Sequence, residues 1–558
     1  MLVVGFFAGQ HQAQGDQGEV RRAGSQKAHS FVERRSSRCV RRLREQRLDH
    51  VSFRTLTVKK IPVDELELHA MGFAVRFAML CAVILGTAGI ARSDDFGQLL
   101  DRMRIRMGPV WRTHLISTSH LTADGVTATV QTDGQDLRFV TRQCTGTLCI
   151  GTYFDGRRLF NININGTTLP RSTNDETYLR GVRTISSFVF LAPDFTANGG
   201  RLEDDGAATI DGVRYRTLLV QNTGADPMQV FVDLRTGLVR FFRDVNDDDS
   251  FEYRDYHTVE GMTLPYNVLR NGATLERYET RGGMQSAFVE PHGLSPTIGT
   301  PEMSVPTDSD KTTPVFACSI AGVDTKCLLD TGNSGLSMSL ELAEQLNAPS
   351  VGAFQVHGLG RYATEVVRTG PLRVGNVTFP NANYVVLHDI HRFGYDVVLG
   401  ADVLAATNVL IDQKAHVVWF GARAANDGVT VPLTFENFVP VVDVRLGELE
   451  AQLAVDTGDE SNINLSYDFY SRHRDLFSAT EQRTVSGVGG SSVELIGRIP
   501  NVRIGDLSIE DQRIGATQLL QGTAFGHLGA AFLENFRVIL DYAQGKLQLV
   551  PGATTPTP

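Results

Sequence analysis

The stretch CLLDTGNSG, residues 327–335, carries an apolar run into the triplet Asp330-Thr331-Gly332. Asp, Thr and Gly are ordinary turn residues, so one such triplet predicts only a turn after a strand. A second triplet, Asp456-Thr457-Gly458, lies within AQLAVDTGDES (451–461) and also follows an apolar run. Two copies in the same context indicate a duplicated structural unit.

The similarity between the two regions continues beyond the triplets. VHGLGRYATEVVRTGPLRVGNVTF (356–379) resembles VSGVGGSSVELIGRIPNVRIGDLSI (485–509), and VVLGADVLAATNVLIDQKAHVVWF (397–420) resembles GHLGAAFLENFRVILDYAQGKLQL (526–549). Residue 456 lies 126 positions after residue 330, and the glycine at 529 lies 129 positions after that at 400. We therefore predict two related β units, which span residues 314–425 and 426–551, each with short alternating strands. A short helix is expected over Leu340–Leu346.

Each unit places one carboxylate where a strand ends in a turn, so the pair Asp330 and Asp456 is a candidate reaction centre. Two adjacent carboxylic groups cannot both ionise readily, and such a pair shares one proton. The ionised partner can accept a proton from water, while the protonated partner donates a hydrogen bond to the carbonyl under attack. A threonine hydroxyl can tie two such loops together, and glycine lets the backbone approach the carboxylates closely.

The tandem units resemble retropepsin-like aspartic peptidases, a group that includes retroviral proteases and bacterial periplasmic relatives. The resemblance rests on both triplets, on two glycine-rich segments and on a hydrophobic-Leu-Gly segment in each unit. It implies two closed β-barrel units in a single-chain pseudo-dimer, hence a monomer, which hydrolyses peptide bonds with Asp330 and Asp456 and needs no metal or cofactor. It further implies that four residues support the catalytic loops, namely Thr331, Gly332, Thr457 and Gly458. Six others are implied to form flaps over a peptide or protein substrate, namely Gly358, Leu359, Gly360, Gly487, Val488 and Gly489.

Several positions depart from the family pattern. Asn333 and Asp459 follow the triplets where Ala or Ser is usual, and His527 replaces an apolar residue before the second Leu-Gly pair. Asp459 and Glu460 add negative charge beside the pair, which predicts a raised pKa for the pair or an altered substrate rim. The alternative to an aspartic endopeptidase is a catalytically inactive periplasmic peptide- or lipid-binding carrier on the same fold.

Four cysteines form two close pairs, Cys144/Cys149 and Cys318/Cys327. The segment VFACSIAGVDTKCLLD (315–330) predicts a hairpin that turns at Gly322-Val323, with Ala321 opposite Asp324. This register places Cys318 opposite Cys327, which is compatible with a disulfide in an oxidising compartment. Two free core thiols are the alternative, and neither spacing predicts a zinc site.

The N-terminal segments predict an exported protein. Residues 1–70 include the basic run RRSSRCVRRLREQR (34–47) without apolar periodicity, which we interpret as a disordered or non-native extension. Residues 71–91 read as a secretory signal peptide, because Arg76 precedes a short apolar run that ends in small residues. A periplasmic or secreted location follows, with an uncleaved membrane anchor as one alternative and a cytoplasmic enzyme that begins at Met1 as another. The net charge of −10 argues against a nucleic-acid partner.

Residues 92–294 are predicted to form an antiparallel β domain, because MQVFVDLRTGLVRFF (228–242) and YRDYHTVEGMTLPYNV (253–268) alternate apolar and polar residues. The order of these strands resembles the LolA-like lipoprotein-carrier half-barrel. That resemblance implies contact with a lipid or lipoprotein, or a domain that presents substrate or covers a cleft. A plain structural β domain is the alternative. Residues 295–313 are expected to be a linker and residues 552–558 a disordered tail.

Overall fold

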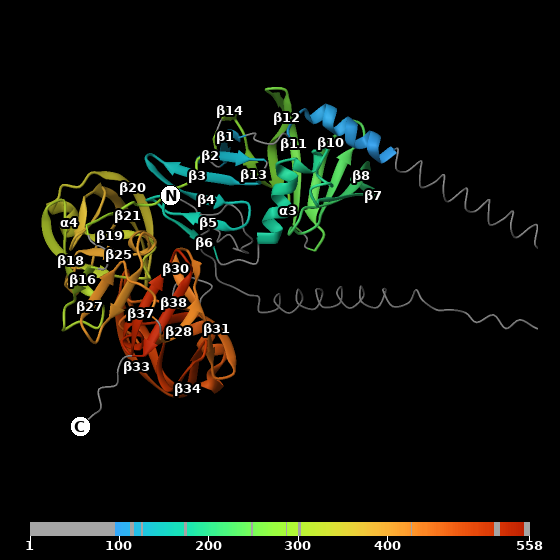
Figure 1. The fold of residues 1–558 in the computed structure, drawn as a ribbon. Coiled ribbons are helices and arrows are strands. Elements are labelled where there is room, and N and C mark those ends of the chain that lie inside the picture. The colour runs from blue at the N-terminus through green and yellow to red at the C-terminus, as the bar shows by residue number, and fades with distance from the viewer. Residues whose placement is uncertain are drawn as a thin grey trace, which may run out of the picture. The chain divides into compact units, whose positions relative to one another are not determined.

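The structure is a computed structural model, and its described part is built predominantly of β-strands, as predicted (Figure 1). No helix within that part is both long and apolar enough to cross a membrane. The predicted extension, signal peptide and tail (1–70, 71–91 and 552–558) lie outside the described residues. Those residues are 95–551 except 112–115, 124–125, 135, 172–175, 247–248, 286, 300–302, 426 and 518–524.

The N-terminal part contains two seven-stranded antiparallel sheets, as the alternating sequence pattern predicts. Most neighbouring strands follow one another in the chain. One helix covers residues 95–107, and two others are α3 (Glu176–Ser186) and η1 (Val189–Leu191). The first sheet consists of β1 (Ile116–Ala123), β2 (Val126–Asp133), β3 (Phe139–Thr145), β4 (Leu148–Phe154), β5 (Leu159–Ile162), β6 (Thr168–Pro170) and β14 (Thr280–Gln285). The second consists of β7 (Arg201–Ile210), β8 (Val213–Gln221), β9 (Met228–Asp233), β10 (Leu238–Asp244), β11 (Ser250–Val259), β12 (Met262–Arg270) and β13 (Ala273–Arg277).

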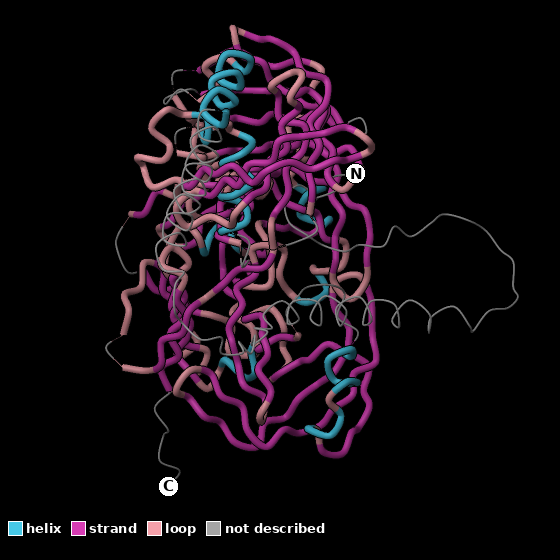
Figure 2. The backbone as a smooth tube through the Cα atoms, turned by 90° about the vertical axis from the view of Figure 1, so that its right-hand side faces the viewer, coloured by secondary structure: helices cyan, strands magenta, loops and turns pink. Residues whose placement is uncertain are grey.

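The C-terminal part contains one large sheet from each predicted unit and a six-stranded sheet to which both units contribute. Figure 2 shows that its helices are short compared with its strands. The first large sheet consists of β15 (Thr297–Ile298), β17 (Val315–Ile320), β18 (Val323–Leu329), β19 (Leu336–Ser339), β20 (Ser350–His357), β21 (Arg361–Thr369), β22 (Leu372–Val374), β23 (Val377–Phe379), β24 (Ala382–Leu387) and β25 (Val397–Leu399). The second large sheet consists of β29 (Thr434–Glu436), β30 (Val439–Leu446), β31 (Leu449–Val455), β32 (Ile463–Ser466), β33 (Ser478–Gly487), β34 (Gly490–Ile504), β35 (Leu507–Thr517) and β36 (Gly526–Leu528). The shared sheet consists of β16 (Met303–Pro306), β26 (Val409–Asp412), β27 (Val417–Phe420), β28 (Val429–Pro432), β37 (Phe536–Asp541) and β38 (Lys546–Pro551).

The two units have the same topology. The strand order β17-β18-β25-β19-β24-β21-β20 in the first corresponds to β30-β31-β36-β32-β35-β34-β33 in the second. A serine side chain caps the corresponding helix in each unit, Ser339 before α4 and Ser466 before α6. The predicted helix at Leu340–Leu346 is α4 (Leu340–Gln345). The other helices are η2 (His391–Phe393), α5 (Ala401–Leu404), α6 (Tyr467–Arg472), η3 (Arg474–Leu476) and α7 (Ala530–Leu533).

Both predicted cysteine pairs are disulfide-bonded, Cys144–Cys149 and Cys318–Cys327. The predicted hairpin register was wrong, however, because Cys318 lies opposite Thr325. The turn consists of Ala321 and Gly322, whose φ angles of 50° and 84° are the left-handed pair that suits a two-residue hairpin. Cys318 and Cys327 are therefore diagonal neighbours, and their Cα atoms are 5.8 Å apart.

Two short strands lie within the segment 295–313, for which the composition suggested a linker. β15 pairs with β23, and β16 pairs with β27 of the shared sheet. The apolar core of the C-terminal part also includes Leu169 of β6, which is 4% exposed. The N-terminal part therefore contributes a buried side chain to the core of the duplicated units.

Candidate active site

The two Asp-Thr-Gly loops occupy equivalent positions at the ends of β18 and β31. The Asp330 amide donates a hydrogen bond to the Leu399 carbonyl (2.9 Å), and the Asp456 amide donates to the Leu528 carbonyl (3.0 Å). Each acceptor lies in a short strand that pairs in parallel with the strand before the aspartate, β25 with β18 and β36 with β31. The hydrophobic-Leu-Gly segments thus hold the two aspartates in place.

The two threonines join the loops through four hydrogen bonds. The Thr331 hydroxyl donates to the Val455 carbonyl (2.5 Å) and accepts from the Thr457 amide (3.0 Å). In the same way the Thr457 hydroxyl donates to the Leu329 carbonyl (2.8 Å) and accepts from the Thr331 amide (3.1 Å). Both threonines are buried. The hydroxyls therefore provide hydrogen-bond partners for backbone groups at a buried position.

The carboxyl groups of Asp330 and Asp456 are hydrogen-bonded to each other. Each also accepts a bond from the glycine of its own triplet, Asp330 Oδ1 from the Gly332 amide (2.8 Å) and Asp456 Oδ1 from the Gly458 amide (3.0 Å). Each glycine also faces the opposite aspartate, because a Cβ on Gly332 would lie 2.6 Å from Asp456 Oδ2. Glycine is therefore required sterically where the two loops meet.

The pair is electrostatically asymmetric. Burial and the neighbouring charge of Asp456 raise the pKa of Asp330 well above its ordinary value. Burial alone would also raise the pKa of Asp456, but hydrogen bonding and charge from His527 outweigh it, and the pKa is lowered. Asp330 is accordingly the protonated partner and Asp456 the ionised one.

His527 lies between two carboxylates, with its Nδ1 atom 3.2 Å from Asp456 Oδ2 and 3.4 Å from Asp459 Oδ2. Burial opposes its charge, but the hydrogen bonds to both aspartates raise the pKa of His527 to about 10. The expectation that Asp459 raises the pKa of the whole pair therefore fails for Asp456, because an imidazolium lies beside both carboxylates. The three side chains are close enough to share a cation, but a protonated imidazole is not a metal ligand, so we assign no metal.

The two glycine-rich segments form the tips of the β20–β21 and β33–β34 hairpins, and the tips meet. The Leu359 amide donates to the Val488 carbonyl (2.8 Å), and a Cβ on Gly360 would lie 2.0 Å from the Gly489 carbonyl oxygen. The remaining predicted tip residues, Gly358 and Gly487, lie at the ends of the same contact, since a Cβ on either would approach Val488 or Leu359. The six predicted flap residues therefore lie together.

An apolar cluster of the first unit includes partly buried side chains from both hairpins, among them Phe354, Tyr362 and Val488. Tyr395 packs against the same cluster, and the sequence offered no sign of its role. Burial, followed by the charges of Asp330, Glu460 and Asp456, raises the pKa of Tyr395, so its phenol stays neutral. The cluster also includes Leu328 of β18 and Val398 of β25, so it extends from the hairpin tips to the strands that lead to the first aspartate loop.

Comparison with known proteins gives a family match within the first unit. A family model described as gag-polyprotein putative aspartyl protease matches residues 316–406. The crystal structure of an aspartic proteinase from Irpex lacteus is similar with a TM-score of 0.31 and 14% identity, over 46% of this chain and 99% of that one. No curated protein gives a significant match. The matched family model lies within the first of the two duplicated units, and the C-terminal part that the structure describes is an all-β fold.

Proposed function

We propose that this protein is an aspartic endopeptidase in which the two units supply one carboxylate each. The observation that carries the proposal is the meeting of the two Asp-Thr-Gly loops, which four threonine hydrogen bonds join and which bring the carboxyl groups of Asp330 and Asp456 together. Asp456 accepts a proton from a water molecule as its oxygen attacks the peptide carbonyl, and Asp330 donates a hydrogen bond to that carbonyl oxygen. The C–N bond then breaks, and a proton from the pair passes to the leaving amine.

The substrate is proposed to be an extended peptide or protein segment beneath the hairpin tips, with apolar side chains towards Phe354, Tyr362 and Tyr395. The disulfides are typical of proteins in an oxidising compartment, which supports export through residues 71–91. For residues 92–294 the lipid- or lipoprotein-binding role remains a proposal that rests on the LolA-like strand order.

The test is incubation of the protein with a diverse peptide mixture from pH 4 to 7.5, followed by mass spectrometry. Asp330→Ala and Asp456→Ala serve as controls, and pepstatin serves as an inhibitor of the class. Cleavage by the wild type that disappears in both variants supports the shared pair. Cleavage that survives either substitution refutes it, and binding of peptides without cleavage indicates the inactive carrier.

His527→Leu, which restores the apolar residue usual in the family, should move the acidic limb of the kcat/KM profile to higher pH. In the wild type the lowered pKa of Asp456 keeps this carboxylate ionised as the pH falls. Without the imidazolium, Asp456 gains its proton at a higher pH and the base is lost sooner. His257→Leu, in the exposed part of β11, is the control and should leave the profile unchanged. An unshifted acidic limb in His527→Leu would contradict the assignment.

Gly332→Ala and Gly458→Ala should each lower kcat/KM by about 10²-fold, because the new methyl group displaces the opposite carboxyl group. A Cβ on Gly458 would lie 2.5 Å from Asp330 Cγ. Gly134→Ala is the matched control, since a Cβ there meets nothing within 4 Å. Initial rates on one peptide identified in the mixture measure the effect. Wild-type rates in both active-site variants would show that the carboxyl groups need not be this close.

A further inference from the structure

A turn of the N-terminal part contacts a buried carboxylate beside the first catalytic loop. The turn connects β5 to β6 (residues 163–167), and the carboxylate belongs to Asp402, the second residue of α5, which is 1% exposed. Asp402 accepts hydrogen bonds from Asn163 Nδ2 (2.8 Å), Asn165 Nδ2 (2.7 Å) and Thr167 Oγ1 (2.5 Å). All three side-chain donors to this carboxylate thus come from one turn more than 200 residues away in the chain.

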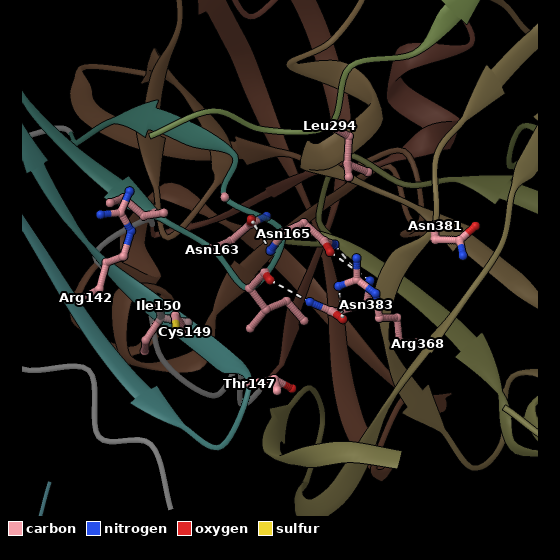
Figure 3. A pocket seen from close by; sticks show the side chains of 13 residues that line it. Arg142, Thr147, Cys149, Ile150, Asn163, Asn165, Leu294, Arg368, Asn381 and Asn383 are labelled. Atoms are coloured by element: carbon pink, nitrogen blue, oxygen red, sulfur yellow. Dashed lines mark hydrogen bonds between the residues drawn. The ribbon is translucent and has the colours of Figure 1, made fainter. Parts of the chain in front are cut away.

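The same turn bonds directly to the catalytic loop and to the neighbouring strand. Asn163 Nδ2 also donates to the Ser334 carbonyl (3.2 Å), four residues after Asp330. The amide group of Asn165 pairs with the backbone of Asn383 on β24, donating to its carbonyl (3.0 Å) and accepting from its N–H (2.8 Å). Figure 3 shows Asn163, Asn165 and Asn383 together at one pocket. The turn therefore contacts both the loop that carries the first aspartate and strand β24 of the same sheet as β18.

The second unit has no equivalent of this arrangement among the described residues. The Ala401 amide donates to the Asn333 carbonyl, and the Ala530 amide donates to the Asp459 carbonyl, so Asp402 corresponds to Ala531. A methyl group thus replaces the carboxylate. Ala531 lines a cavity of about 350 Å³ instead of a docked turn. Hydrogen bonding from a turn of the N-terminal part is therefore specific to the first catalytic loop.

Loss of the contact between the turn and Asp402 would carry a large free-energy cost. A carboxylate that is removed from water and left without donors carries an unfavourable desolvation free energy of several kcal/mol. Burial raises the pKa of Asp402, and the three hydrogen bonds from the turn oppose that rise. If the N-terminal part were absent, Asp402 would lose these donors close to Gly335, where an added Cβ would lie 3.1 Å from Asp402 Oδ2. The loop that carries Asp330 would then lose one of its supports.

We propose that the β5–β6 turn is a permanent part of the first catalytic loop, with Asn163 as the residue that positions the loop. The N-terminal part acts in this respect as a scaffold for the active site and not as a segment that is removed to activate it. The consequence for the rate of cleavage rests on the proposed function. The consequence for the loop itself does not.

Asn163→Asp is the informative variant in the full chain. Asn163 Oδ1 accepts bonds from the Asn165 and Thr167 amides, and an aspartate retains these bonds and the shape of the turn. It loses the donor to Ser334 and Asp402 and places a negative charge beside another. Thr167→Val is a second variant, which removes only the hydroxyl donor to Asp402. Asn222→Asp, in an exposed turn of the same part of the chain, is the matched control.

Amide hydrogen exchange, measured by mass spectrometry, directly reports the local stability of the first catalytic loop. In Asn163→Asp the amides of residues 330–335 should exchange about tenfold faster, with a smaller increase in Thr167→Val, while residues 456–461 keep the wild-type rate. Unchanged exchange at 330–335 in Asn163→Asp overturns the proposal. Equal acceleration in both loops also overturns it, because the effect would then be general destabilisation.

Peptide cleavage provides the second readout. A misplaced Asp330 should lower kcat about tenfold in Asn163→Asp and leave KM unchanged, because the flaps and the apolar cluster are not altered. A rise in KM with unchanged kcat contradicts a positioning role. A wild-type protein that cleaves no peptide would refute the proposed function, yet the exchange experiment would still decide whether the turn holds the loop.

Discussion

Asp456→Asn should lower kcat/KM by about 10⁴-fold, whereas Asp330→Asn should lower it by only about 10²-fold. The difference follows from the protonation states of the pair. His527 lowers the pKa of Asp456, and in the proposed mechanism this carboxylate accepts the proton from water, which an asparagine cannot do. The pKa of Asp330 is raised, and in the proposed mechanism its protonated carboxyl group donates a hydrogen bond, which an asparagine Nδ2 can still do.

Steady-state rates on a single peptide, at a pH where the wild type is most active, measure this difference. Asp468→Asn, on the exposed side of α6, serves as the control and should keep the wild-type rate. Equal losses in the two variants would show that the proton is shared without preference. A larger loss in Asp330→Asn would reverse the assigned roles.

The sequence could predict the aspartate pair because all the necessary signals are local and occur twice. Each Asp-Thr-Gly triplet follows an apolar strand, and each hydrophobic-Leu-Gly segment lies at nearly the same distance downstream. A duplicated chain that folds into two similar units places such signals at equivalent positions. The cysteine pairs were likewise close in sequence, so a disulfide was geometrically reasonable even though the register of the hairpin was wrong.

The register was wrong because it depends on the turn and not on the strands. Strand alternation is unchanged by a shift of two paired positions, and only the left-handed φ angles of Ala321 and Gly322 place the turn one residue earlier. Alanine rarely adopts such a φ angle, so the sequence favoured a turn with glycine at its first position. The disulfide tolerates the shift because diagonal neighbours are still close enough to bond.

The features that distinguish the two halves could not be predicted, because they depend on contacts between distant segments. His527 was recognised as an exception to the family pattern, but its effect depends on the position of Asp459 in the folded second loop. No local sequence pattern marks Asp402, because its donors at Asn163 and Thr167 lie in another part of the chain. The two Asp-Thr-Gly carboxylates occupy equivalent positions, but the residues around them differ.

Thr331→Val and Thr457→Val should each lower the free energy of unfolding by about 2–4 kcal/mol. Valine has nearly the same shape as threonine but neither donates nor accepts a hydrogen bond. Each substitution leaves one buried amide and one buried carbonyl without a partner, in Thr331→Val those of Thr457 and Val455. Each such group costs about 1–3 kcal/mol.

The double variant should lose less than the sum of the two single variants, by about 1 kcal/mol. Once one hydroxyl is gone the loops separate slightly, and the bonds of the remaining hydroxyl are already weakened. Urea unfolding followed by intrinsic fluorescence measures the free energy of unfolding of the three variants. Thr430→Val, at an exposed position of β28, is the control and should change stability by less than about 0.5 kcal/mol. Strictly additive losses would mean that the two threonines act independently. Coupled losses would mean that the two units are joined at the same four hydrogen bonds that hold the catalytic loops together, so that stability and activity have a common structural origin.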